Sequence, residues 1–214
     1  FSINGTGDTL TVNGWFAGDE NKIEQVQFAD GTSWDAAAIE SMFAANIITG
    51  TIYNDAINGT AGIDYIQAGA GNDTVNADDG NDTIIGGAGS DVLAGGAGDD
   101  TFLINGTDTS YDRFQGDAGY DVVQGSDGDD TIRVNNFSGN YTVEKIDGGL
   151  GTNVIAGTQY NDTIDLSATE LVNISNVDGG VGNDTITGSA GNDTFLVNGT
   201  DTSYDRFQGD AGYD

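Results

Sequence analysis

Residues 86–103 read GGAGSDVLAGGAGDDTFL, which is one nine-residue pattern written twice. Each copy has glycine at positions one, two and four, aspartate at position six, and a large apolar residue at position eight. Glycines ahead of the aspartate predict a tight turn, because glycine adopts backbone conformations that other residues avoid. The three residues after the aspartate predict a short strand whose middle side chain faces away from its neighbours. The pattern therefore predicts a turn and a strand in every nine residues.

The same register covers most of the chain from Gly50 onward. Six segments run without a gap over 50–103, three occupy 107–133, two occupy 148–165 and two occupy 179–196. Their eighth positions are apolar throughout the first nine segments, at Ile57, Ile66, Val75, Ile84, Leu93, Phe102, Phe114, Val123 and Ile132. An all-β solenoid of stacked parallel coils follows, with two segments per coil and the apolar residues meeting in a narrow core.

A longer repeat lies on top of the short one. Residues 100–121, DTFLINGTDTSYDRFQGDAGYD, reappear at 193–214 with one difference, Ile104 against Val197. Near identity over such a stretch indicates recent tandem duplication of a unit about 93 residues long. We therefore expect the chain to be a piece of a longer repetitive protein, with 179–214 as the start of a second copy.

The composition narrows the classes of function. The chain has 35 acidic and 5 basic residues, no histidine and no cysteine, for a formal charge of −30. Nucleic acids and anionic membranes are poor partners for such a surface, and no apolar run is long enough to insert into a bilayer. Disulfides and thiolate metal sites are excluded, and without histidine we expect a protein that is not an enzyme. The acidic excess calls for a cationic ligand.

Calcium is the cation that the turns predict. Glycines let backbone carbonyls point inward, and a short carboxylate beside them completes the oxygen-rich surroundings that Ca²⁺ prefers. Alternate turns stack, so Asp55, Asp73 and Asp91 should line one edge, and Asp64, Asp82 and Asp100 the other. Aspartate is also an ordinary turn residue, but turn preference alone does not place an apolar residue two positions later each time.

The predicted ligands are one carboxylate per turn and the glycine carbonyls around it. The carboxylates are those of Asp55, Asp64, Asp73, Asp82, Asp91, Asp100, Asp112, Asp121, Asp130, Asp162, Asp184, Asp193, Asp205 and Asp214. The carbonyls are those of Gly69, Gly71, Gly86, Gly87, Gly89, Gly95, Gly96, Gly98, Gly179, Gly180 and Gly182. Weaker or altered sites are expected where the pattern changes, at Ala68, Ala77, Asp78, Asp79 and Asn153.

The repeats resemble the RTX family of haemolysin-type calcium-binding nonapeptides, whose pattern is G-G-x-G-x-D-x-U-x. The resemblance implies a right-handed parallel β-roll that folds on calcium, exported by a type I secretion system of a Gram-negative bacterium to the cell surface or medium. Residues 50–133 would form the roll. Residues 134–178 would form longer coils with degenerate repeats, in which the inserts 134–147 and 166–178 take no calcium.

Residues 1–49 differ from the rest and are similar to the haemolysin-type calcium-binding related domain. Alternating apolar and polar residues over 7–16 and 21–35 predict short strands, with a tight turn at ADGT. The stretch DAAAIESMFAAN, 35–46, predicts a short helix that Asp35 caps and that carries Ile39, Met42 and Phe43 on one face.

Two functions from different classes remain open. The first is a calcium-rigidified structural segment of a large secreted or surface-attached protein, of the adhesin, S-layer or extracellular filament type. The second is an accessory module of a secreted enzyme, such as a protease, a lipase or a polysaccharide epimerase, whose catalytic domain lies elsewhere. Self-association through the terminal coils, or a cell-surface or polysaccharide target, would add a partner besides calcium.

Overall fold

A computed structural model describes residues 25–27, 33–35, 45–104, 109–138, 142–196, 204–209 and 212. The chain divides into two compact units, Phe1–Ala44 and Ala45–Asp214. The described residues form strands and turns and contain no helix, so none of them forms a helix able to cross a membrane.

In the first unit, β1 (Gln25–Gln27) pairs antiparallel with β2 (Ser33–Asp35). Val26 stands opposite Trp34, and the turn predicted at ADGT, residues 29–32, lies outside the described residues. The helix predicted for 35–46 falls almost wholly outside the described residues; Asp35 ends β2 and Asn46 begins β3.

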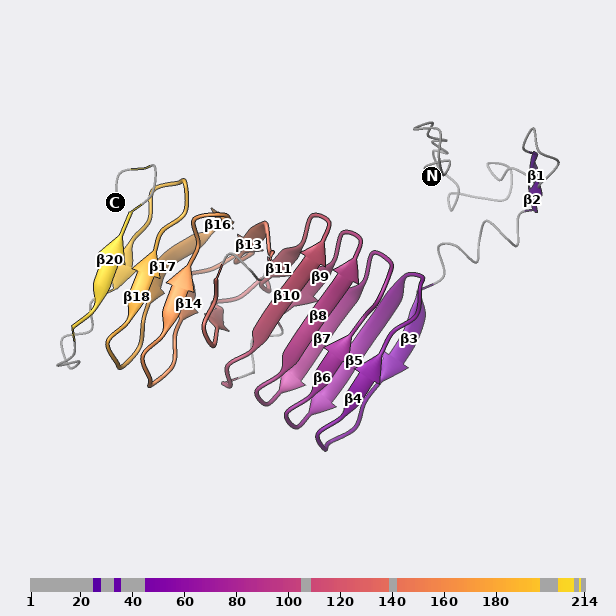
Figure 1. Cartoon of the computed structure of the whole chain (residues 1–214), viewed down its shortest axis with the longest axis horizontal. Helices are drawn as coiled ribbons and strands as arrows, with labels where there is room; N and C mark the ends of the chain where they lie inside the picture. Colours follow the sequence, from indigo (N-terminus) through magenta and orange to yellow (C-terminus); the bar gives the residue numbers. More distant parts are fainter. Residues whose placement is uncertain are drawn as a thin grey trace. The chain divides into compact units, whose positions relative to one another are not determined.

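The second unit opens as a solenoid in which successive strands alternate between two parallel sheets (Figure 1). One sheet contains β4 (Ala56–Asn58), β6 (Thr74–Asn76), β8 (Val92–Ala97) and β10 (Arg113–Ala118). The other contains β3 (Asn46–Thr49), β5 (Asp64–Ala70), β7 (Thr83–Ala88), β9 (Thr101–Leu103), β11 (Val122–Gln124), β13 (Lys145–Asp147) and β16 (Glu170–Val172). The predicted parallel coils of two nine-residue segments are therefore confirmed.

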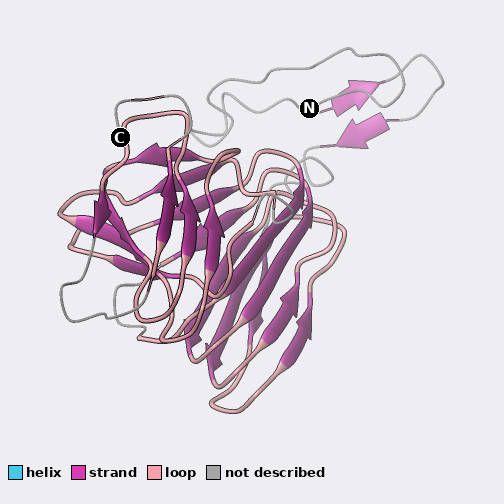
Figure 2. Cartoon of the chain, turned by 60° about the vertical axis from the view of Figure 1, so that its left-hand side comes forward, coloured by secondary structure: helices cyan, strands magenta, loops and turns pink. Residues whose placement is uncertain are grey.

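Two further parallel sheets carry the rest of this unit (Figure 2). One contains β12 (Thr131–Arg133), β14 (Asn153–Ala156), β17 (Ile174–Asp178) and β19 (Phe195–Leu196). The other contains β15 (Thr163–Asp165), β18 (Thr185–Thr187) and β20 (Arg206–Gln208). The glycine-poor inserts supply strands of their own, β13 from 134–147 and β16 and β17 from 166–178.

The coil length changes where the sequence register slips. Equivalent aspartates are 18 residues apart in the first coils, 21 apart from Asp91 to Asp112, and 22 apart from Asp162 to Asp184. Parallel pairing nevertheless continues, with Phe114 still opposite Leu93. The three extra residues are therefore absorbed outside the ladder, and the core register is kept.

The core is a stack of the eighth-position side chains, as predicted. Ile66 pairs with Ile84, Ile84 with Phe102, and Phe102 with Val123, and none of the four is exposed to solvent. Phe102 also meets Phe114 from the facing sheet edge-on, with ring centroids 5.5 Å apart and an interplanar angle of 64°. One apolar side chain per strand thus fills the space between the sheets.

Replacing Phe102 with alanine should lower the free energy of unfolding by about 3–5 kcal/mol, because the narrow core cannot close over the cavity. The measurement is urea unfolding in saturating calcium. Ile52→Ala is the matched control, since Ile52 is 73% exposed and its loss should cost no more than about 0.5 kcal/mol. Equal stability of the two variants would contradict this view of the core.

Candidate metal centres

The position-six aspartates of alternate turns are joined in two hydrogen-bonded ladders. In one, Oδ1 of Asp73 accepts the backbone N–H of Asp55 at 2.8 Å, and Asp73 donates its own N–H to Oδ1 of Asp91 at 2.8 Å. In the other, Asp64 donates to Asp82, and Asp82 to Asp100, again at 2.8 Å. Each accepting carboxylate thus reaches back to the preceding coil, and the two predicted edges are those of the two ladders.

The ladders extend into the later coils with changes of residue type. Asp91 donates to Asp112, Asp100 to Asp121, Asp162 to Asp184, and Asp184 to Asp205, at 2.8–3.0 Å. Asp130 donates to Oδ1 of Asn153 at 2.9 Å. Oδ2 of Asp193 accepts the N–H of Ser189 from its own turn, and Asp214 lies outside the described residues.

Four of these carboxylates are buried with one oxygen unsatisfied. Asp73, Asp82, Asp100 and Asp121 are at most 1% exposed, and their Oδ2 atoms have no hydrogen-bond partner. A buried anion without a partner is costly, so the native state needs a cation or a proton at each of these oxygens. These unpaired oxygens are the strongest sign of metal sites in the structure.

Burial accordingly raises the pKa of these carboxyl groups. The pKa of Asp100 rises to about 7, and those of Asp82 and Asp121 to about 6, with burial as the largest cause in each. The N–H donated from the preceding coil opposes the shift, and neighbouring carboxylates such as Glu144 beside Asp121 add to it. A cation bound among them would have the opposite effect, since it favours the ionised form.

The predicted glycine ligands surround these carboxylates. At position one, a Cβ on Gly86 would lie 2.5 Å from Oδ2 of Asp91, and one on Gly179 would lie 2.6 Å from Oδ2 of Asp184; Gly95 stands in the same way beside Asp100. Glycine leaves space around the carboxylate in these turns.

At positions two and four, the glycines have a positive φ and lie against the preceding coil. Gly87 has φ +99° and Gly89 has φ +125°, and a Cβ on either would overlap a carbonyl oxygen of Gly69 or Gly71. The other predicted carbonyl donors at these two positions share the positive φ: Gly69, Gly71, Gly96, Gly98, Gly180 and Gly182. Calcium ligation by these carbonyls and carboxylates stays a prediction.

Asn153 indicates which kind of chemical group fits beside the carbonyl oxygens of such a turn. This residue stands where other turns have aspartate, and its Nδ2 donates to the carbonyl oxygens of Leu150 at 3.1 Å and Asn173 at 3.0 Å. An amide N–H group therefore lies between two carbonyl oxygens, one from its own turn and one from the following coil. The carbonyls and the unpaired carboxylate oxygens together fit a hard cation such as Ca²⁺.

The ligand shell has to be mainly backbone. Among the described residues, no three acidic side chains gather at one point as a metal-binding cluster. A site with one or two carboxylates must take its other oxygens from carbonyls, which suits the six to eight oxygens that Ca²⁺ accepts.

Substitutions within the repeat leave the turns intact. Ala68 and Ala77 at position one are fully buried, and Asp78 at position two adopts φ 75°, the conformation that glycine has in the other turns. Both turns keep an unpaired Oδ2, on Asp73 and Asp82. Weaker calcium binding at these turns stays a prediction.

Sequence reasoning missed three features that join the coils. At position five, side-chain acceptors reach forward: Oδ1 of Asn54 accepts the N–H of Asn72, and Oδ1 of Asn72 that of Ser90. Glu144, in a stretch without the nine-residue pattern, accepts the N–H of Asp121 at 2.8 Å and so extends a ladder. In some turns, the hydroxyl of a threonine or serine at position two donates a hydrogen bond to the aspartate carboxylate. The recurring Asn-Asp pair at positions five and six was a signal for the first feature.

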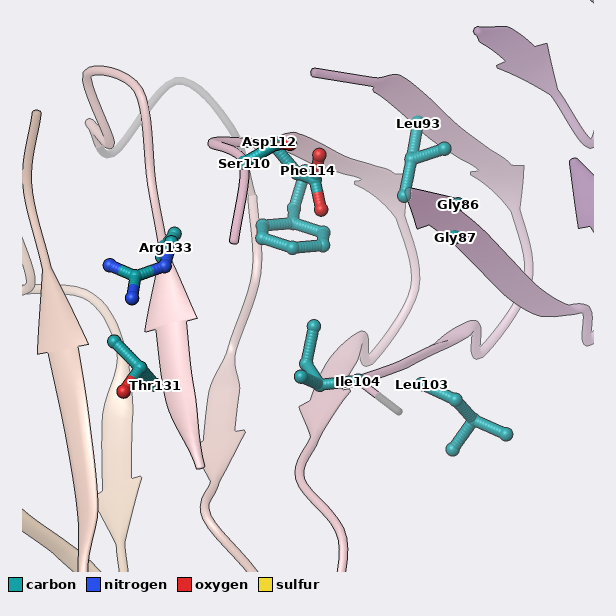
Figure 3. Close-up of a pocket in the computed structure, with 10 residues that line it drawn as sticks. All are labelled: Gly86, Gly87, Leu93, Leu103, Ile104, Ser110, Asp112, Phe114, Thr131 and Arg133. Atoms are coloured by element: carbon teal, nitrogen blue, oxygen red, sulfur yellow. The ribbon is translucent and has the colours of Figure 1, made fainter. Parts of the chain in front are cut away.

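A small cavity marks the register slip between Leu103 and Asp112. Its lining comes from β7, β8, β9, β10 and β12 and includes Phe114 and Arg133 (Figure 3). At about 20 Å³ it has room for about one water molecule. The cavity therefore belongs to the packing of the slip rather than to the turns that carry the carboxylates.

Comparison with known proteins agrees with this geometry. The RTX calcium-binding nonapeptide repeat family matches residues 49–84, 76–103, 112–138, 147–168 and 176–202, which together span more than half of the chain. The haemolysin-type calcium binding protein related domain matches residues 1–38. No curated protein matches the chain as a relative. The chain thus belongs to the RTX calcium-binding nonapeptide repeat family and is a calcium-binding repeat region.

Proposed function

We propose that this chain is a calcium-rigidified structural segment of a larger RTX protein, secreted or surface-attached on a Gram-negative bacterium, that folds on Ca²⁺ after export. The observation that carries the proposal is the set of buried carboxylates whose Oδ2 atoms have no partner. Low cytosolic calcium would leave the chain unfolded for passage through a type I secretion system. Millimolar calcium outside would complete the coils.

The residues of each turn have separate tasks in this process. Oδ1 of the aspartate holds the preceding coil through a backbone N–H, as Asp82 holds Asp64. Oδ2 and nearby carbonyls would hold the ion, and glycines leave room for it. Bound Ca²⁺ supplies positive charge, which offsets the repulsion within a chain of formal charge −30. Folding free energy then depends on the calcium concentration.

A structural role is favoured over an accessory role by the longer repeat. The stretch 100–121 recurs at 193–214, and coils added by tandem duplication lengthen a solenoid without changing its local geometry. Adhesins, S-layer proteins and extracellular filaments all need such spacers. Further copies of the 93-residue unit in the complete gene would support this role, whereas a catalytic domain beside the repeats would replace it with the accessory one.

The experiment that tests calcium-driven folding is a titration followed by far-UV circular dichroism. We expect a cooperative change from coil to β-structure with a midpoint near about 10⁻⁴–10⁻³ M calcium, absent with magnesium and reversed by EGTA. Magnesium should fail because it demands a smaller octahedral shell and loses its water reluctantly. A β-spectrum already complete in EGTA would contradict the proposal.

A further inference from the structure

The turns of this chain are of two kinds, which differ in how the position-six aspartate is satisfied. We call a turn open when positions two and four have a positive φ, and hydroxyl-closed when position two is a threonine or serine that bonds the aspartate. The open turns are 68–73, 77–82, 86–91, 95–100, 116–121, 148–153 and 179–184. The hydroxyl-closed turns are 50–55, 59–64, 125–130, 157–162 and 188–193.

In a hydroxyl-closed turn, the residue at position two donates hydrogen bonds to the carboxylate of the aspartate in the same turn. The N–H of Thr60 donates to Oδ2 of Asp64 at 2.7 Å, and its hydroxyl donates to the same oxygen at 3.1 Å. The hydroxyl also accepts the N–H of Gly62 at 3.4 Å. The turns of Thr51, Ser126 and Thr158 repeat these bonds, and in the turn of Ser189 the N–H donates to Oδ2 of Asp193 while the hydroxyl donates to Oδ1. No buried Oδ2 without a partner is found at the hydroxyl-closed turns within the described residues.

The backbone distinguishes the two kinds independently of the side chains. Position four is glycine in both 59–64 and 86–91, yet only Gly89 has a positive φ, and only there would a Cβ overlap the preceding coil. A Cβ on Gly62 would have its nearest contact 3.9 Å away, with Oγ1 of Thr60. The hydroxyl-closed turn is therefore a different conformation and not an open turn with one changed side chain.

Four of the five hydroxyl-closed turns come first in their ladders. Asp82 accepts an N–H from Asp64 of the preceding coil, and Asp184 accepts one from Asp162. Within the described residues, the carboxylates of Asp55, Asp64, Asp130 and Asp162 accept hydrogen bonds from their own turns and none from an earlier coil. The hydroxyl of position two thus supplies to these four carboxylates a hydrogen bond that later members of a ladder receive from an earlier coil.

We propose that the residue at position two decides which aspartates bind calcium, so that open turns take the ion while hydroxyl-closed turns are calcium-independent starting turns. The assignment rests on the proposed calcium-driven folding and divides eleven of the fourteen predicted carboxylates into two groups. Asp73, Asp82, Asp100 and Asp121 are calcium ligands, as are Asp91 and Asp184 in turns of the same kind. Asp55, Asp64, Asp130, Asp162 and Asp193 are bound by hydroxyl groups in place of the ion.

Asn153 supports this division, because its turn is open but has no carboxylate. Gly149 and Gly151 have φ +75° and +88°, and the amide of Asn153 donates to the carbonyl oxygen of Leu150 in its own turn and to that of Asn173 in the following coil. An open turn is thus closed by a positively polarised group, either a cation or an amide. In a hydroxyl-closed turn, the N–H and the hydroxyl of position two are themselves such positively polarised groups.

The test compares Asp64→Asn with Asp82→Asn in the full chain. The two residues are successive members of one ladder, both are at most 1% exposed, and each change removes the same charge. Bound calcium per chain is measured by equilibrium dialysis against calcium in excess KCl. We expect Asp82→Asn to lose one ion relative to the parent and Asp64→Asn to lose none. A crystal structure in calcium should show an ion at Oδ2 of Asp82 and none at Oδ2 of Asp64.

Each outcome bears on a separate claim. Loss of an ion from Asp64→Asn, or no loss from Asp82→Asn, would overturn the division of turns while leaving calcium-driven folding intact. A parent chain that binds no calcium would instead overturn the proposed function. Thr60→Val should lower the urea midpoint without changing the ion count, and Thr60→Ser should preserve both. An unchanged midpoint for Thr60→Val would show that the hydroxyl does not close the turn.

Discussion

Replacing Asp100 with alanine is expected to lower the free energy of unfolding in saturating calcium by at least about 3 kcal/mol. The carboxylate accepts the N–H of Asp82 at 2.8 Å, and its other oxygen is the proposed calcium ligand. The variant would leave a buried N–H unpaired, which alone costs about 1–3 kcal/mol, and would also lose the binding energy of an ion. Urea unfolding at fixed calcium measures the change.

The matched control is Asp127→Ala. Asp127 lies at position three of the hydroxyl-closed turn 125–130 and is exposed. The substitution removes the same charge, and we expect a change within about 0.5 kcal/mol, typical of surface positions. If both variants had the same stability, net charge rather than the ladder would govern the response. A normal calcium requirement in Asp100→Ala would likewise exclude this turn from the folding mechanism.

The repeating part of this fold could be predicted from the sequence because its physics is local. Glycine before Asp91 and an apolar residue at Leu93 place a turn and a buried strand within nine residues, and the next turn repeats the same pattern. Parallel stacking follows from repetition, since equal coils bring equal positions together. The buried row from Ile66 to Val123 and the two aspartate ladders are direct consequences of this register.

Other features depend on interactions that the nine-residue pattern does not contain. Thr60 and Ser126 look like ordinary polar turn residues, and their role emerges only when the hydroxyl is seen to satisfy Asp64 or Asp130. Glu144 joins its ladder because an insert with no glycine turn returns to the same edge. The change to a second pair of sheets after β11 follows from where the inserts place β12 and β15, which the lengths of the inserts alone do not determine.

Acidification is expected to promote folding in the absence of calcium, in contrast to ordinary acid denaturation. The pKa of Asp100 is raised to about 7, and those of Asp82 and Asp121 to about 6, from 3.8. Between about pH 4 and 7 the folded state therefore binds more protons than the unfolded chain, and the free energy of unfolding falls as pH rises. Protons at pH 5 would neutralise the same buried oxygens that we propose calcium neutralises at pH 7.5.

The measurement is far-UV circular dichroism in calcium-free buffer between pH 7.5 and 5, at low protein concentration to limit association near the isoelectric point of 4.1. β-structure should increase as pH falls, and the calcium midpoint should rise, because protons compete with the ion. Lower net charge would also relieve repulsion, so Asp82→Asn, Asp100→Asn and Asp121→Asn are combined as a control variant. Its pH dependence should be much shallower. A parent chain that loses structure on acidification would show that these carboxylates are not what prevents folding without calcium.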